Sequence, residues 1–486
     1  MSDETIFQNP NTSGQAGMSK PPPVPPVVPL PSQSSVPQPP APPPVDEGKS
    51  FLSRFLSIRT VKLIVGLLVV LIVGFLAISL ISSLGGKKDK NVTLTYWGLW
   101  EDPAVMQPVI ADFERENPNI KVDYSKQDVK EYRERLSSRI ANGAGPDIFR
   151  FHNTWYPMLK EDLSPLPESV IRKEEFLDNF YPVAEADLVK NGAIYGIPLH
   201  IDTLALFVNR DMFQAAGVNP PASWEEFRDY ALELTVKDEE GNIKTAGAAM
   251  GTFENVTHSP DILSLLFIQN GVDVYGLKPS QRLTDALNFY TSFAEGDESV
   301  WNKTLDNSIL AFAKGNLAMF FGYSWDFFTL KAINPNLSFE IVPVPQLAEG
   351  EKIALASYWA EGVSSESKHQ KEAFLFMKFL ARKDTQEKLF TEESRTRLFG
   401  ELYSNKNLSE RLKDNSYVYS IVKQAPFARS SYFVDNTFDN GINAKLNTYL
   451  KDAINSILAG GSAESASETL VNGFNQVVSQ YESQTK

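Results

Sequence analysis

Strand-like and helix-like segments alternate between residues 92 and 149, and this alternation limits the possible folds more than any other feature of the chain. Residues 92–97 and 120–124 alternate apolar and polar side chains, and residues 146–149 enter a third apolar segment. The intervening segments repeat apolar residues at helical spacing: Val105, Val109, Ile110 and Phe113, then Tyr132, Leu136 and Ile140. This β-α-β-α-β order predicts an α/β fold in which helices cover both faces of a parallel sheet.

The loops that follow these strands are the expected place for a ligand. In open α/β sheets, ligands bind beyond the carboxyl ends of the strands, which here are residues 97–101 and 150–155. The Gly143-x-Gly145 pair does not predict a nucleotide site, because it ends a helix and lacks the third glycine of a dinucleotide motif.

A second informative stretch runs from Asn191 to Phe227. Residues 203–208 have the β-branched, aromatic and aliphatic composition of a buried strand. A short helix over residues 211–216 is expected to end at Gly217, where a left-handed residue can close it. The Ser223-Trp-Glu-Glu226 segment has the spacing of a capping box, which predicts the start of another helix.

This order of strand, short helix and capped helix resembles family 1 extracellular solute-binding proteins, the substrate-binding components of ABC importers, many of them specific for sugars. The resemblance extends from Val92 to the C-terminus, with further agreement at residues 144–147, 312–325, 341–345, 354–362 and 371–379. It implies a two-lobed periplasmic-binding-protein-like fold with hinge crossings, in one domain over residues 91–486. The implied lobe 1 covers about 91–200 and 355–400, and lobe 2 covers about 203–345 and 401–486.

The N-terminal 50 residues do not have the composition of a folded domain. Residues 21–44 contain 13 of the 31 prolines, and proline favours polyproline II and cannot donate to a ladder. We therefore expect residues 1–50 to form a disordered, Pro-rich arm. Two functions remain open for it, a spacer and a ligand for an SH3-like or WW-like groove.

Leu63–Leu84 is a run of 22 uncharged, mostly apolar residues. As a helix it would be ~33 Å long, enough for a hydrocarbon core of ~30 Å. We expect one transmembrane helix over residues 61–84 rather than a cleaved signal peptide, because some sixty residues precede it and no A-x-A site follows. The resemblance implies a single-pass cell-membrane protein with a cytoplasmic N-terminus and an extracytoplasmic binding domain.

Charge and composition exclude several kinds of partner. A net charge of −14 and a pI near 5.0 argue against a nucleic-acid partner. The chain has no cysteine, which excludes disulfides, zinc thiolates and a lipid-modified cysteine. The histidines at positions 152, 200, 258 and 369 form no H-x-x-x-H pair. We therefore expect no cofactor and no dedicated metal site.

Tryptophans and polar residues gather at the expected strand ends and crossings. Indole rings cover the C–H face of a sugar, and carboxylates and amides bind its hydroxyl groups. The predicted ligand-binding residues are Trp97, Trp100, Glu101, Asn153, Trp155, Asp202, Trp325, Tyr358, Trp359 and Glu361. Structural roles remain open for some of them: Trp97 continues a strand pattern, Trp359 lies in a crossing that needs hinge packing, and Asp202 is placed to cap a strand end.

These observations favour a membrane-anchored extracytoplasmic protein that captures a sugar or oligosaccharide by lobe closure. As the resemblance implies, it would deliver the solute to the permease subunits of an ABC importer, and it would not be an enzyme. One alternative is a ligand sensor or adhesion protein. Another is a cell-surface glycosidase, which would need two facing carboxylates from among Glu101, Asp147, Asp202 and Glu361. The sequence does not name the solute.

Overall fold

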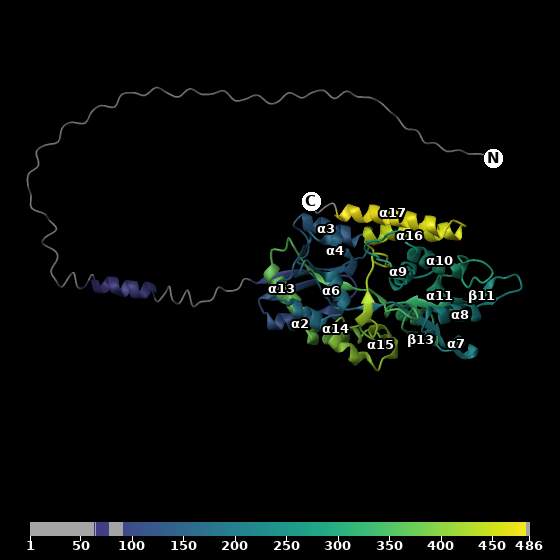
Figure 1. The fold of residues 1–486 in the computed structure, drawn as a ribbon. Helices are drawn as coiled ribbons and strands as arrows, with labels where there is room; N and C mark the ends of the chain where they lie inside the picture. Colours follow the sequence, from purple (N-terminus) through teal and green to yellow (C-terminus); the bar gives the residue numbers. More distant parts are fainter. Residues whose placement is uncertain (1–62, 64, 77–90, 483–486) are drawn as a thin grey trace, which may run out of the picture. The chain divides into compact units, whose positions relative to one another are not determined.

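The computed structural model describes residues 63, 65–76 and 91–482, and the chain divides into two units, Met1–Lys87 and Lys88–Lys486 (Figure 1). In the first unit, residues 65–76 are helical and expose apolar side chains, including Val70 and Phe75. Among the described residues, no helix is long and apolar enough to cross a bilayer. The expected arm lies outside the described residues, and the expected span lies partly outside them.

The first large sheet of the second unit confirms the predicted parallel β-α-β-α-β arrangement. Strand β1 is parallel to both β2 and β3, with Leu94 opposite Val122 and Tyr96 opposite Ile148. A strand from much later in the chain, β15, then pairs antiparallel with β3. The sheet has the order β2-β1-β3-β15-β4, with β7 also on β15: β1 (Val92–Gly98), β2 (Ile120–Lys126), β3 (Ile148–His152), β4 (Leu163–Ser164), β7 (Ile197–Pro198) and β15 (Trp359–Ser364).

The second large sheet has the order β10-β11-β12-β9-β13. Every residue of its β9 and β12 is buried, as expected of strands covered on both faces. Gly247 in β11 allows close packing, because a Cβ there would collide with the carbonyl oxygen of Ala231 in the helix α8 (Trp224–Glu233). The strands are β9 (Ala205–Asn209), β10 (Val236–Lys237), β11 (Ile243–Ala248), β12 (Leu317–Gly322) and β13 (Phe339–Val342).

A small three-stranded sheet carries the chain between these two sheets. It consists of β8 (Asp202–Thr203), β14 (Ala354–Ser357) and β16 (Ala428–Arg429), with β14 in the middle. The predicted strand over residues 203–208 is therefore divided, because Leu204 separates β8 in the small sheet from β9 in the second large sheet. The two large sheets with their helices form two lobes, and we call the small sheet the hinge sheet.

Local sequence signals position the helices as predicted. Helix α7 (Arg210–Ala216) ends at Gly217, whose φ is 72°, and both bonds of the Ser223–Glu226 capping box start α8 (Trp224–Glu233). In the first lobe, α14 packs against α2 and α13 against β15. The first-lobe helices are α2 (Pro103–Glu116), α3 (Tyr132–Ala141), α4 (Tyr156–Leu159), α5 (Lys173–Asn179), α6 (Pro182–Leu188), α13 (Gln370–Leu380) and α14 (Lys383–Glu393).

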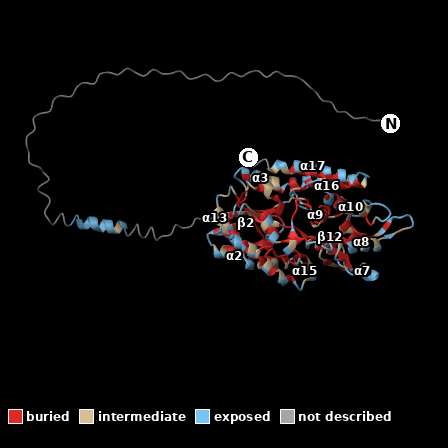
Figure 2. Cartoon of the chain, in the orientation of Figure 1, coloured by how far each residue is buried: buried red, intermediate tan, exposed pale blue. Residues whose placement is uncertain are grey.

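The two last helices of the chain, α16 (Ile442–Leu458) and α17 (Ala463–Glu482), form its C-terminal end. Helices α16 and α17 pack against each other and against α10. The C-terminal end of α17 contacts α4 of the first lobe (Figure 1). The central strands of the two large sheets are buried, while the outer faces of the helices are exposed (Figure 2). The remaining helices are α9 (Ser259–Gln269), α10 (Gln281–Thr291), α11 (Ser308–Ala313), α12 (Asp326–Ile333), α15 (Ser416–Val422), α16 (Ile442–Leu458) and α17 (Ala463–Glu482).

Candidate ligand-binding site

Four of the predicted tryptophans come together at the carboxyl ends of β1 and β3. The ring centroid of Trp359 lies 5.4 Å from that of Trp100 and 5.2 Å from that of Trp155, both edge-to-face. Tyr132 then links Trp155 to Trp97, at 6.1 and 6.5 Å. We call this group, completed by Phe438 at 6.3 Å from Trp100, the aromatic cluster: Trp97, Trp100, Tyr132, Trp155, Trp359 and Phe438.

The aromatic cluster has a buried side and an exposed side. Trp155 has no exposed surface, whereas Trp100 is 38% exposed and Phe438 is 44% exposed. Trp97 and Trp359 are half-buried. Large aromatic rings at the surface mark places where an apolar face is available to a partner or ligand. Trp155 therefore supports the cluster from beneath, and Trp100 and Phe438 offer their rings to solvent.

The loop that carries Phe438 is held in a strained conformation. Phe438 has a φ of 54°, and Asn436 and Asn440 are also left-handed. Such a backbone costs a bulky L-residue about 1–2 kcal/mol and is found where the surroundings enforce it. Here Asp439 enforces it, since its carboxylate accepts the N–H groups of Asn443 and Ala444 at the start of α16, at 2.9 and 3.0 Å.

A second group of aromatic and acidic side chains lies in the second lobe, around Asp261. The Tyr323 hydroxyl donates to Asp261 at 2.6 Å, and the Trp325 ring stacks on Tyr323 at 4.4 Å between centroids. His258 contacts Asp326 through Nε2 at 2.9 Å. The backbone N–H of Asp435 donates to the other oxygen of Asp261. We call this the Asp261 group: His258, Asp261, Tyr323, Trp325, Asp326 and Asp435.

Electrostatics in the Asp261 group favour a protonated imidazole. Burial opposes the charge on His258, but Asp326 and the other carboxylates outweigh burial and raise its pKa to about 9. Burial also raises the pKa of Asp261, to about 6. Asp435 has a side chain that is 42% exposed and approaches His258 Nδ1 at 4.0 Å. It therefore offers a carboxylate to solvent beside His258, whose ring centroid lies 6.1 Å from that of Trp325.

The segment 435–438 joins the two groups. Asp435 belongs to the Asp261 group of the second lobe, and Phe438, three residues later, contacts Trp100 of the first lobe. Exposed rings from both lobes and one exposed carboxylate thus lie along a single short segment. This arrangement can receive a flat, hydroxyl-bearing molecule, which needs apolar faces and hydrogen-bond acceptors.

Two predicted ligand carboxylates are instead held inside the first lobe by Arg150. This arginine has no exposed surface and contacts Glu361 at 2.6 Å and Glu101 at 2.5 Å. Tyr96 also donates to Glu361, which is fully buried. Burial raises the pKa of Glu101, but Arg150 outweighs it and lowers the value to about 2. Glu361 is therefore out of reach of a ligand in this conformation. The same holds for Trp155, which also has no exposed surface.

Two further predicted residues belong to a buried network around Asp187. Its carboxylate accepts hydrogen bonds from the Asn153 amide and the Tyr358 hydroxyl, both at 2.8 Å, and from Ser430. Burial raises the pKa of Asp187. Because Asp187 lies in α6 and its partners come from the turn after β3, the β14–β15 junction and the end of β16, the network ties the first lobe to the hinge sheet. Asn153 and Tyr358 thus act on the hinge, and their polar groups are already bonded.

Asp202 also positions another residue. Its carboxylate accepts from the backbone N–H and the hydroxyl of Ser324, at 3.1 and 2.5 Å. Burial raises its pKa well above the ordinary value. Since Ser324 directly precedes Trp325, Asp202 of the hinge sheet fixes the turn that presents the Trp325 ring.

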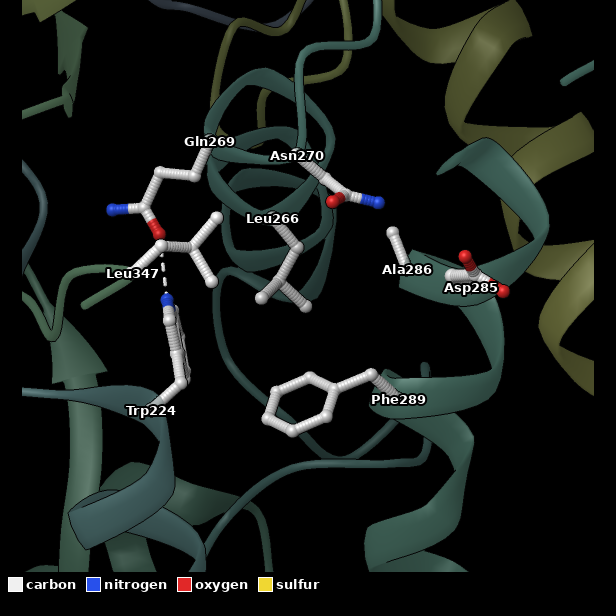
Figure 3. Close-up of a pocket in the computed structure, with 8 residues that line it drawn as sticks. All are labelled: Trp224, Leu266, Gln269, Asn270, Asp285, Ala286, Phe289 and Leu347. Carbon is white, nitrogen blue, oxygen red and sulfur yellow. Dashed lines mark hydrogen bonds between the residues drawn. The ribbon is translucent and has the colours of Figure 1, made fainter. Parts of the chain in front are cut away.

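Three pockets of the described chain lie away from the two aromatic groups. One lies in the second lobe, where Leu266, Phe289 and Leu347 surround the Trp224–Gln269 hydrogen bond (Figure 3). Its volume of about 280 Å³ is at the lower limit for a small-molecule site. Another lies between α5 and α13–α14, and a third lies beside β16. None of the three is lined by a predicted ligand-binding residue.

Sequence reasoning missed Phe438, Asp435 and His258. These residues lie outside the helices and strands, so no periodic spacing of apolar residues could identify them as site residues. One signal was available: residues 435–441 read Asp-Asn-Thr-Phe-Asp-Asn-Gly, a composition typical of turns with left-handed residues. No comparable sequence signal marks His258, whose left-handed φ of 61° is visible only in the structure.

Residues 97–387 match the family of bacterial extracellular solute-binding proteins. The chain belongs to this family. It is 24% identical over 306 residues to the multiple sugar-binding protein of Streptococcus mutans, a match that covers 60% of this chain and 72% of the relative. This family membership confirms the resemblance expected from the sequence.

Solved structures agree with the two-lobed fold. The sugar-binding protein MalE of Xanthomonas citri matches with a TM-score of 0.66 and 18% identity, over 81% of this chain and 100% of that one. The ABC substrate-binding protein of Listeria monocytogenes in complex with cycloalternan matches with a TM-score of 0.62 and 20% identity, over 80% and 100%. The family and these structures are binding proteins rather than enzymes. The buried ion pairs of Glu101 and Glu361 with Arg150 likewise differ from the facing carboxylates that a glycosidase needs.

Proposed function

We propose that this solute-binding protein captures a carbohydrate between the aromatic cluster and the Asp261 group. The proposal rests on aromatic rings from the two lobes that lie near one short segment. Trp100 contacts Phe438, both of them exposed, and the half-buried Trp325 stacks on the buried Tyr323, whose partner Asp261 accepts from the Asp435 N–H. The sugar-binding relatives support it. The C–H face of a pyranose gains dispersion and apolar burial on an indole ring.

Direct ligand contacts are assigned to Trp100, Trp325, Trp359, Phe438 and Asp435. The Asp435 carboxylate would accept hydrogen bonds from sugar hydroxyls, and this polar contact supplies selectivity because an unpaired buried hydroxyl costs about 1–3 kcal/mol. The predicted Trp97 borders the site through Tyr132. Supporting roles are assigned to Glu101, Asn153, Trp155, Asp202, Tyr358 and Glu361.

Lobe closure would couple capture to transport. A ligand that touches both lobes favours the closed arrangement by its differential affinity for that state. The hinge sheet is the place for the motion, since hinges are short crossings that absorb dihedral changes. We infer that the closed form delivers the solute to the permease subunits of an ABC importer, as the family membership supports.

We also propose that one helix over residues 61–84 anchors the protein in the cell membrane. The uncharged run from Leu63 to Leu84 supports this, as do the exposed apolar side chains of the helical residues 65–76. The N-terminus would then be cytoplasmic and the binding domain extracytoplasmic. The test is fractionation of cells that produce the full chain or a variant lacking residues 61–84. Carbonate-resistant membrane association of both forms would contradict the anchor.

A thermal-shift screen of the purified full chain tests ligand capture. Neutral mono- and oligosaccharides are compared with amino acids and polyamines. A bound sugar at 100 times its Kd stabilises the native state by about 2.7 kcal/mol. At about 0.8 kcal/mol/K of unfolding entropy for a domain of this length, the expected rise in Tm is about 3 °C. A rise with amino acids or polyamines but with no carbohydrate would contradict the proposal.

A further inference from the structure

Three ligating atoms from distant parts of the chain converge in the first lobe. His200 Nε2 lies 3.3 Å from Glu393 Oε1 and 3.7 Å from Glu101 Oε1. All three atoms lie within 4.8 Å of one another. Glu101 comes from the loop after β1, His200 from the approach to β8, and Glu393 from the last residue of α14.

These atoms are buried and lack hydrogen bonds. The side chains of Glu101 and Glu393 are each 3% exposed, and that of His200 is 13% exposed. None of the three atoms has a hydrogen-bond partner among the described residues. A buried polar atom without a hydrogen-bond partner destabilises the folded state, and more so when it is charged. Three such atoms that face one point are therefore placed to bind an additional group.

The second oxygen of each carboxylate is already fixed. Glu101 Oε2 accepts from Arg150 at 2.5 Å. Glu393 Oε2 accepts from the backbone N–H of Glu401 at 2.5 Å and lies 3.4 Å from Arg397. These bonds orient each Oε1 toward His200, in the way that outer partners orient the ligands of metal sites.

Charge balance points to a divalent cation. The connected ionic groups are four carboxylates, those of Glu101, Glu361, Glu393 and Glu401, and two guanidiniums, those of Arg150 and Arg397. With a neutral imidazole, −4 + 2 leaves two negative charges. A protonated His200 would neutralise one of them, and a divalent cation neutralises both.

The distances fit zinc with modest adjustment. In a tetrahedral site with ligand bonds of about 2.1 Å, neighbouring ligand atoms lie about 3.4 Å apart. The two distances from His200, 3.3 and 3.7 Å, bracket this value. A donor set of one imidazole and two carboxylates suits zinc better than calcium or magnesium, which prefer oxygen ligands alone. We propose that Glu101, His200 and Glu393 bind one zinc ion, with a water as the fourth ligand.

Such an ion would connect the first large sheet to the entrance of the hinge sheet. Because the unfolded chain holds these residues far apart, zinc would stabilise the folded state by mass action. Glu101 directly follows Trp100, so the zinc site borders the proposed sugar site, but zinc binding would not depend on the identity of the solute.

The experiment is a calorimetric titration of the chelator-treated full chain with zinc, followed by measurement of Tm. We expect one equivalent to bind with a Kd below about 1 µM and to raise Tm by at least 3 °C at 100 times Kd. Replacement of zinc by cobalt gives a second readout on the unaltered protein, because tetrahedral cobalt absorbs strongly in the visible range.

The matched variants are His200→Gln and His369→Gln. The first removes the imidazole ligand and is expected to weaken zinc binding at least 100-fold, while the second changes a histidine outside the cluster and is expected to leave it unchanged. If the wild type binds no zinc more tightly than His200→Gln does, the three residues form only an ion-paired cluster and the proposal is overturned. Should His200→Gln fail to fold, absence of a tetrahedral cobalt spectrum in the wild type overturns it equally.

Discussion

Removal of the Arg150 guanidinium tests the inner support of the binding site. Arg150 is fully buried between Glu101 and Glu361, at 2.5 and 2.6 Å, and its substitution by methionine keeps the length of the side chain. The change leaves two buried carboxylates without their cation. Breaking a buried ion pair in this way costs about 3–5 kcal/mol.

The corresponding change in Tm follows from the size of the domain. Roughly 390 residues at about 2.1 cal/mol/K each give an unfolding entropy of about 0.8 kcal/mol/K. A loss of 3–5 kcal/mol therefore lowers Tm by about 4–6 °C. Scanning calorimetry of the full chain at pH 7.5 measures this decrease in Tm.

The matched control is Arg382→Met. Arg382 is 40% exposed and pairs with Glu116 and Asp384 at the surface. An exposed pair contributes about 0–1 kcal/mol, so the control should lower Tm by no more than about 1 °C. If Arg150→Met and Arg382→Met change Tm equally, the carboxylates near Arg150 are solvated, and the assignment of Glu361 to a supporting role fails.

Three further predictions concern the two aromatic groups. Trp325→Ala should weaken sugar binding at least tenfold, as measured by calorimetry. Trp224→Phe, in the remote pocket, should leave the affinity unchanged, and equal affinities in the two variants would refute the placement of the ligand. His258 has a pKa of about 9 in the folded state and about 6.5 in the unfolded state. Its protonation therefore contributes roughly 3 kcal/mol to the free energy of unfolding, complete below pH 6.5 and lost as the pH rises through 9. The Tm difference between wild type and His258→Gln should accordingly shrink between pH 6.5 and 9, and a constant difference would contradict the assignment. Phe438→Gly should relieve a left-handed backbone, so Tm should fall by no more than 1 °C while sugar affinity falls; a larger loss of Tm would show that the ring is part of the core.

Much of the fold could be predicted because its signals are local. The apolar spacing of residues 92–149 and the capping box at Ser223 depend only on neighbouring residues, and both are confirmed. The tryptophans at strand ends could also be identified, because the strand ends of a parallel sheet meet at one edge.

The roles of the polar residues could not be predicted, because their partners are set by long-range register. Glu361 lies directly opposite Arg150 only because β15 pairs antiparallel with β3. Glu101, His200 and Glu393 lie far apart in the chain, so their spacing does not indicate the metal site that we propose. Phe438 depends on a left-handed backbone that Asp439 stabilises, and an isolated phenylalanine in a turn carries no such information.

A crystal structure of the protein grown with the oligosaccharide that gives the largest thermal shift would locate the ligand. We expect sugar density between the lobes, with ring faces on Trp100 and Trp325 and a hydroxyl bonded to Asp435. Density in the Trp224–Phe289 pocket, or sugar bound to one lobe without any contact to these rings, would contradict this expectation.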